Sequence, residues 1–186
     1  MKKTYVTFLT LPVLILIVSL ACNLSGGPTP PRAVPTSPEL AQSVETTLQT
    51  VQPDPTSGKL QFTVTEAQMT SYVNYNLRQD FEPILKNPVI VFQPDKMELY
   101  GTIQSDSITA NGQVVMSVDI NDQGKPSVKI TEANFGPIPV PTGLLTNLST
   151  AIDRSLSDAM SQNNSDYQLE SIKITTGSAT VTIRKK

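Results

Sequence analysis

Residues 113–120 read Gln-Val-Val-Met-Ser-Val-Asp-Ile, and this stretch decides the fold class because an apolar residue stands at every second position, with polar residues at all the others except Val115. Val114, Met116, Val118 and Ile120 fall on every second position, which places their side chains on one face of a β-strand. The same period recurs nearby at Val89 and Val91, at Met97, Leu99 and Ile103, and at Val128 and Ile130. Turn signals separate these runs at Pro94-Asp95, Ala110-Asn111-Gly112 and 121–124. The sequence therefore predicts an antiparallel meander over residues 88–135 with one apolar face.

Two helices are predicted before the meander. Ser37 is a good N-cap residue and Pro38 suits the first helical position, so one helix begins there and stops before Pro53. Thr65 and Gln68 have the spacing of a capping box. They follow a short alternating strand at 60–64 and predict a second helix that ends before residue 83.

A longer helix is predicted after the meander, at 142–162, with an apolar side that includes Leu145, Leu148, Ile152 and Leu156. A hairpin follows, with strands near 169–174 and 179–183. A helix of about 20 residues is roughly 30 Å long, which is the length of a nine-residue strand. These patterns predict an α+β fold, a curled antiparallel β-sheet of about six strands wrapped along the long amphipathic helix, with one or two additional helices.

The N-terminus has the order of an export signal. Lys2 and Lys3 precede an apolar run at 8–20, then small Ala21 and Cys22, which is the single cysteine of the chain. This arrangement resembles the lipobox of bacterial lipoproteins, in which the cysteine is acylated, for example with palmitate, and becomes the new N-terminus. Serine stands three residues before Cys22, where the lipobox usually has leucine. An uncleaved membrane anchor with an incidental cysteine is the alternative.

Three segments are therefore predicted: a lipoprotein signal peptide at 1–21, a Cys-anchored Pro-rich linker at 22–36, and a single domain at 37–186. The linker is expected to be an extended tether of roughly 40 Å. Under either interpretation of Cys22, the domain is expected at the extracytoplasmic face of the cell membrane.

Composition argues against several function classes. Without residues 1–21 the chain keeps 12 of its 14 basic residues against 16 acidic ones, a net charge of −4, which does not favour nucleic acid. The chain has no histidine, the commonest general base and zinc ligand, and no tryptophan for sugar stacking. The segment beginning at Asp119 starts like a calcium loop but has Ile130 at the twelfth position. We expect no enzyme activity, metal site or cofactor, and a monomer.

Four features in order carry a resemblance to a known family: the capped helix at 65–72, a meander with few aromatic residues, a strand that runs through 134–141 into a Leu-rich helix, and the hairpin at 172–181. In these features the chain resembles the LmeA-like phospholipid-binding family and the related YpmS-like membrane-anchored proteins. The resemblance implies a domain similar to the tubular lipid-binding domains, a curled sheet around a long helix with a lipid-accepting interior.

These observations predict an exported, lipid-anchored, non-enzymatic protein that binds an acyl chain or phospholipid in an apolar groove. Candidate site residues are Cys22 for lipidation and Leu145, Leu148, Ile152 and Leu156 for lipid binding. The alternative is a structural or protein-interaction lipoprotein of the cell envelope with an ordinary packed core.

Overall fold

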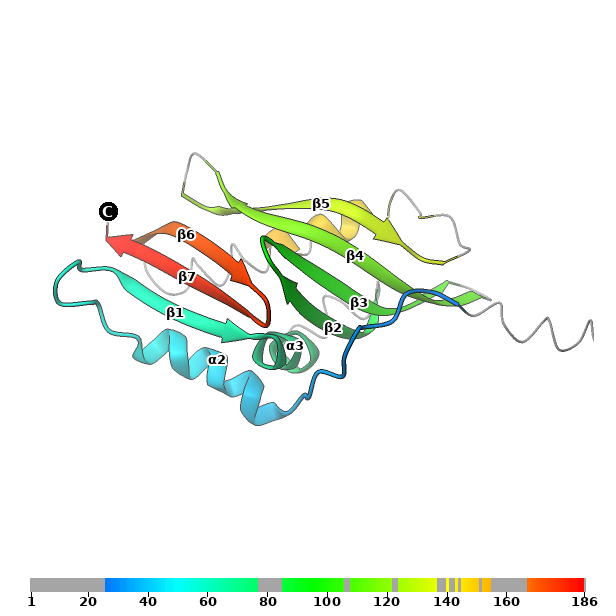
Figure 1. The fold of residues 1–186 in the computed structure, drawn as a ribbon, viewed down its shortest axis with the longest axis horizontal. Coiled ribbons are helices and arrows are strands. Elements are labelled where there is room, and N and C mark those ends of the chain that lie inside the picture. The colour runs from blue at the N-terminus through cyan, green and yellow to red at the C-terminus, as the bar shows by residue number, and fades with distance from the viewer. Residues whose placement is uncertain are drawn as a thin grey trace, which may run out of the picture.

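The computed structural model describes residues 26–76, 85–105, 108–121, 124–136, 140, 143, 145–150, 152–154 and 167–185. Figure 1 shows two antiparallel sheets side by side, with two helices along one flank. The helices are α2 (Pro38–Thr50) and α3 (Glu66–Tyr75). The strands are β1 (Leu60–Thr65), β2 (Lys86–Gln93), β3 (Lys96–Ser105), β4 (Ile108–Ile120), β5 (Pro126–Asn134), β6 (Tyr167–Thr175) and β7 (Ser178–Lys185). One sheet has the order β1-β7-β6 and the other β2-β3-β4-β5.

The four-stranded sheet is the predicted meander, and its register confirms the predicted apolar face. Paired residues in antiparallel strands share a face, so Leu99 opposite Val114 and Met97 opposite Met116 point into the interior. These four side chains belong to, or pack against, one hydrophobic cluster that also includes Phe92 of β2. The opposite face carries Glu98, Tyr100 and their partners.

The prediction of a turn at Ala110-Asn111-Gly112 is wrong, because these residues belong to β4. Gly112 is paired with Gly101 of β3. A Cβ on Gly112 would lie 2.2 Å from Phe135 Cδ1, and one on Gly101 would lie 2.5 Å from Leu85 Cγ. The glycines therefore let large apolar side chains approach the backbone closely rather than reverse the chain.

Both predicted helix starts are confirmed. The Ser37 hydroxyl accepts a hydrogen bond from the Leu40 N–H, and Pro38 begins α2. Thr65 and Gln68 form the predicted capping box of α3. The two helices pack together, and Ser71 of α3 accepts a hydrogen bond from the Ser37 N–H at 3.1 Å.

The two sheets meet where the four-stranded sheet has its β2–β3 and β4–β5 turns. The Asp95 N–H donates to the Ile174 carbonyl, and the Leu169 N–H donates to the Gly124 carbonyl. Ile174 and Ala179 of the three-stranded sheet also enter the shared hydrophobic cluster. The second sheet therefore closes one end of the interior.

The predicted fold class, a single curled sheet of about six strands around a long helix, is wrong. The described structure is mostly β, with seven strands in two antiparallel sheets, and its longest helix is the 13-residue α2. Alternation establishes that one face of a strand is buried, but not what covers it. Here part of the covering comes from a second sheet, which forms because β1 pairs with the distant β7.

The helix predicted at 142–162 is seen in part. Residues 143, 145–150 and 152–154 are helical, and 155–162 lie outside the described residues. This helix lies beside β5, where Asp153 Oδ1 accepts a hydrogen bond from the Val128 N–H at 3.4 Å. No long amphipathic helix is evident in the described part of the chain. Within the same residues, none of the helices has the length and apolar character needed to cross a membrane.

Candidate functional site

Two of the predicted lipid-binding residues lie together in the hydrophobic cluster. Leu148 is 2% exposed and Ile152 is 7% exposed, and Leu145 packs against the same cluster while remaining partly exposed. Leu156 and Cys22, the other predicted site residues, lie outside the described residues. Of the five predicted site residues, Leu148 and Ile152 therefore lie in the cluster and Leu145 lies against it.

The interior has a rim of apolar side chains that are only partly covered. They come from β3, β4, β5, β6 and the helix beside β5, and they pack on the buried cluster without being enclosed by it. Prominent members are Met97, Ile103, Val118, Ile130, Leu145 and Ile172. Aliphatic side chains that stay partly open to solvent beside a core provide a surface that an apolar ligand could cover.

A polar row, which the sequence patterns did not reveal, runs along α3. Glu66, Thr70 and Asn74 are spaced four residues apart and meet the free edge of β2. The Phe92 N–H donates to Glu66 Oε1 at 2.7 Å, and the Ile90 N–H donates to Thr70 Oγ1 at 2.9 Å. Asn74 Nδ2 donates to the Pro88 carbonyl at 2.7 Å.

The spacing of this row has a geometric reason. Four residues of helix advance about 6 Å, and two residues of strand advance about 6.7 Å. A polar side chain on each turn of α3 can therefore reach each outward-facing backbone position at 88, 90 and 92. The contact satisfies an edge that would otherwise be open to pairing with another chain.

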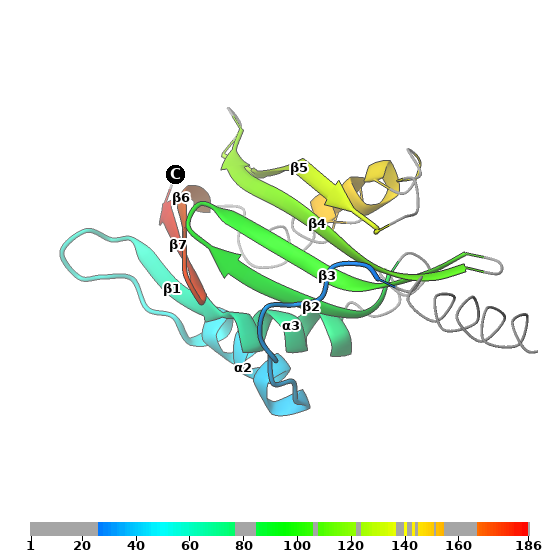
Figure 2. The ribbon, with the colours of Figure 1, turned by 45° about the vertical axis from the view of Figure 1, so that its right-hand side comes forward.

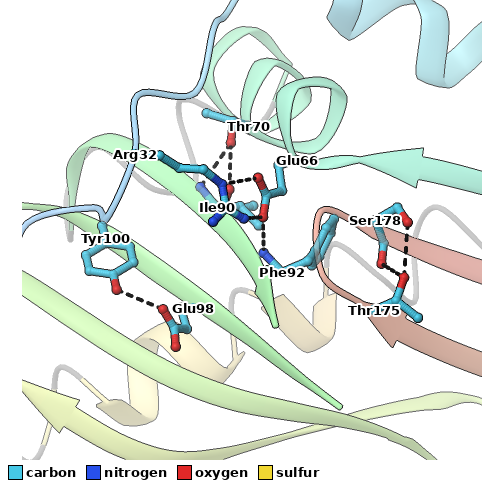
Figure 3. A network of polar contacts seen from close by, with 9 residues as sticks. All are labelled: Arg32, Glu66, Thr70, Ile90, Phe92, Glu98, Tyr100, Thr175 and Ser178. Carbon is cyan, nitrogen blue, oxygen red and sulfur yellow. Dashed lines mark hydrogen bonds and ion pairs between the residues drawn. The ribbon is translucent and has the colours of Figure 1, made fainter. Parts of the chain in front are cut away.

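Glu66 is the centre of this region, and Figure 3 shows how the surrounding groups point toward it. Glu66 is 8% exposed. Its carboxylate accepts two hydrogen bonds from Arg32, one of them from Nε at 3.0 Å. This pairing raises the pKa of Arg32 further above the usual arginine range. The Glu66 N–H donates to the Gly177 carbonyl, and the Gly177 N–H donates to the Phe92 carbonyl. One residue thus connects α3, β2 and the β6–β7 turn.

Arg32 belongs to residues 26–36, here called the strap, which precede α2. In Figures 1 and 2 the strap crosses the outer side of the four-stranded sheet before it turns into α2. The sequence predicted a tether over 22–36, but the described part of it contacts the domain. Residues 26–36 form no helix or strand, and their Pro-rich composition gave no sign of where they would bind.

The outer face beneath the strap carries a second polar group. The Tyr100 hydroxyl donates to Glu98 Oε2 at 2.8 Å and accepts from Gln113 Nε2 at 2.9 Å (Figure 3). Burial, followed by the hydrogen bond to Glu98, raises the pKa of Tyr100 to about 12. At physiological pH the hydroxyl is protonated and can donate the hydrogen bond to Glu98.

The polar side chains form two groups, one around Glu66 and one around Tyr100. Every buried side-chain nitrogen or oxygen in the described residues has a hydrogen-bond partner. Among those residues, no group of three or more His, Cys, Asp or Glu side chains could hold a metal ion. The arrangement can hold the strap and the edge of β2, while the apolar rim is the part that could contact a ligand.

Comparisons with known proteins do not assign this chain to a family. No family model matches the chain, and the search of curated proteins gave no match. The resemblance to the LmeA-like and YpmS-like proteins therefore stays a hypothesis based on sequence patterns.

Proposed function

We propose that this chain is a membrane-anchored, non-enzymatic protein of the cell envelope that binds an acyl chain or phospholipid along its apolar interior. The observation that carries the proposal is the partly exposed rim, which continues the buried cluster across several strands. An acyl chain covering the rim would remove apolar surface from water, at about 25 cal/mol per Å².

The proposed ligand position follows from the difference in burial between the cluster residues and the rim residues. Leu148 and Ile152 would form the floor, because they are already buried, and Leu145 and Ile130 would contact the chain from the rim. The proposal needs no cofactor, nucleic acid or second copy of the protein. Cys22 would carry the acyl anchor that holds the domain at the extracytoplasmic face of the membrane.

A structural or protein-interaction lipoprotein is the second candidate. The observation that favours it is the deep burial of Leu148 and Ile152 among residues of both sheets, as in an ordinary core. In this case the rim would contact a protein or only border the core.

Native mass spectrometry of the purified full chain tests the lipid proposal. We expect lipid adducts on the wild type and fewer on Ile130→Asn, because a polar amide on the rim weakens an apolar contact. Lys129→Asn is the matched control, since Lys129 neighbours Ile130 on the same strand and is exposed. Absence of lipid from the wild type, or equal loss in both variants, would contradict lipid binding at the rim.

The anchor is tested separately with Cys22→Ser. We expect the variant to incorporate no labelled fatty acid and to keep its signal segment, because the thiol is the acceptor in a lipobox. Gel mobility and fatty-acid labelling in bacterial cells measure both effects. Equal labelling of the variant and the wild type would rule out Cys22 as the acylation site.

A further inference from the structure

The start of the strap is held against one particular end of the four-stranded sheet. A Cβ on Gly27 would lie 2.0 Å from the Asn111 carbonyl oxygen of β4. A Cβ on Gly136, just after β5, would lie 2.4 Å from the Gly26 carbonyl oxygen. The backbones of these segments are therefore in close contact, and this contact together with the Arg32–Glu66 pair fixes the strap at two points.

This end, here called the tip, is opposite the second sheet. The tip comprises the adjoining ends of β3, β4 and β5 near residues 103, 110 and 134. The second sheet contacts Asp95 and Gly124, which are in the turns at the other end. Figure 1 shows the strap running toward the β3–β4 end and away from β6 and β7.

The length of chain before the strap limits where its anchor can lie. Cys22 precedes Gly26 by four residues. Because an extended residue spans at most about 3.6 Å, Cys22 lies within about 14 Å of Gly26. A free tether from Cys22 to Ser37, by contrast, would reach roughly 40 Å and leave the domain free to rotate.

We propose that the strap presents the tip to the phospholipid bilayer that carries the anchor, so that the partly exposed apolar residues of the tip face the membrane. This inference rests on the proposed acylation of Cys22. Ile103 and Ala133 are partly exposed apolar residues on the inner face at the tip. The bilayer is the chosen partner because the anchor places its surface within reach of these residues. Lipid could then pass from the membrane to the rim without crossing the polar outer face.

Energy transfer from single labelled cysteines to a lipid-headgroup acceptor tests the orientation. The full acylated chain is placed in vesicles of phosphatidylethanolamine and phosphatidylglycerol, with a donor dye on Thr109→Cys near the tip or on Ser127→Cys. Both native residues are exposed, and Ser127 pairs with Asp119 at the far end of β4. The two positions are about 33 Å apart along the sheet, so we expect transfer from Thr109→Cys to exceed that from Ser127→Cys by more than about twofold.

Releasing the strap should remove this difference. Gly27→Val breaks the contact at Asn111, and Arg32→Ala breaks the pair with Glu66. The two substitutions are combined in one variant, so that neither fixed point remains, and this variant is made with each label. We expect the two transfer efficiencies to become similar, within about 30%, because a longer free tether allows the domain to rotate. Circular dichroism and a denaturant midpoint verify that each variant is folded, and hydrogen exchange at residues 28–36 reports release of the strap.

The outcomes separate the orientation from the anchor. Equal transfer from both labels in an acylated, vesicle-bound wild type would overturn the orientation and leave the anchor intact. An unchanged difference after hydrogen exchange has shown strap release would also overturn it. A wild-type chain without an acyl group, found by mass spectrometry of the same sample, would overturn the anchor and the orientation together, while lipid binding at the rim is measured independently.

Discussion

Replacing Glu66 with alanine is expected to lower the free energy of unfolding by about 2–4 kcal/mol. The main cause is the Phe92 N–H, which would lose its hydrogen-bond acceptor. Phe92 is only 1% exposed, so water cannot readily replace the carboxylate. Loss of an acidic residue at the start of α3 adds a smaller term, since the carboxylate faces the positive end of the helix dipole. Arg32 contributes little of its own, because its side chain is 41% exposed and can be hydrated.

Glu66→Gln is the matched variant, because it keeps an oxygen for the Phe92 N–H but removes the charge that pairs with Arg32. We expect this variant to lose much less stability than Glu66→Ala, because an ion pair with an exposed partner contributes little. Urea denaturation of wild type, Glu66→Ala, Glu66→Gln and Arg32→Ala measures these differences. A loss below about 0.5 kcal/mol in Glu66→Ala would show that the edge of β2 does not depend on the carboxylate.

The local parts of this fold could be predicted because their causes are local. The cap at Ser37, the capping box at Thr65 and Gln68, and the alternating residues at 114–120 each depend on neighbours a few residues away. The partition into two sheets depends instead on the pairing of Thr63 with Thr180, which are 117 residues apart. No period in the sequence specifies such a pairing.

The buried side of α3 shows a different limit. Val73 is buried and Met69 packs on the hydrophobic cluster, as expected for a helix on a core, but α3 also buries Glu66, Thr70 and Ser71. A helix that packs on a sheet face buries apolar residues, whereas a helix that lies along a strand edge must also satisfy backbone groups. The sequence shows that Glu66, Thr70 and Asn74 are spaced four residues apart, but it does not show which strand they contact.

The burial of two candidate site residues could also be predicted from a local pattern. A helical pattern correctly brought Leu148 and Ile152 onto one buried side, because residues four apart share a helix face. The same pattern could not distinguish a ligand groove from a core, since both bury apolar side chains. Arg32 was missed because a single basic residue in a Pro-rich segment gives no signal of its distant carboxylate.

Replacing Ile152 with alanine is expected to lower the free energy of unfolding by about 2–5 kcal/mol and also to reduce lipid retention. Ile152 is 7% exposed within the cluster, so truncation removes buried methyl groups and leaves a cavity. If the residue also forms the floor beneath an acyl chain, the cavity loosens the surface on which that chain rests. The two effects should therefore appear together.

Val44→Ala is the matched control, because Val44 is a buried aliphatic residue of α2 that lies outside the hydrophobic cluster. It should cost stability without changing lipid retention. The measurement pairs the denaturant midpoint of the lipid-free protein with the amount of lipid bound per chain.

A large destabilisation by Ile152→Ala with no lipid on either form would favour the structural lipoprotein. A loss well below about 2 kcal/mol with weakened lipid retention would instead place Ile152 on an open channel, since space already present there makes truncation less costly.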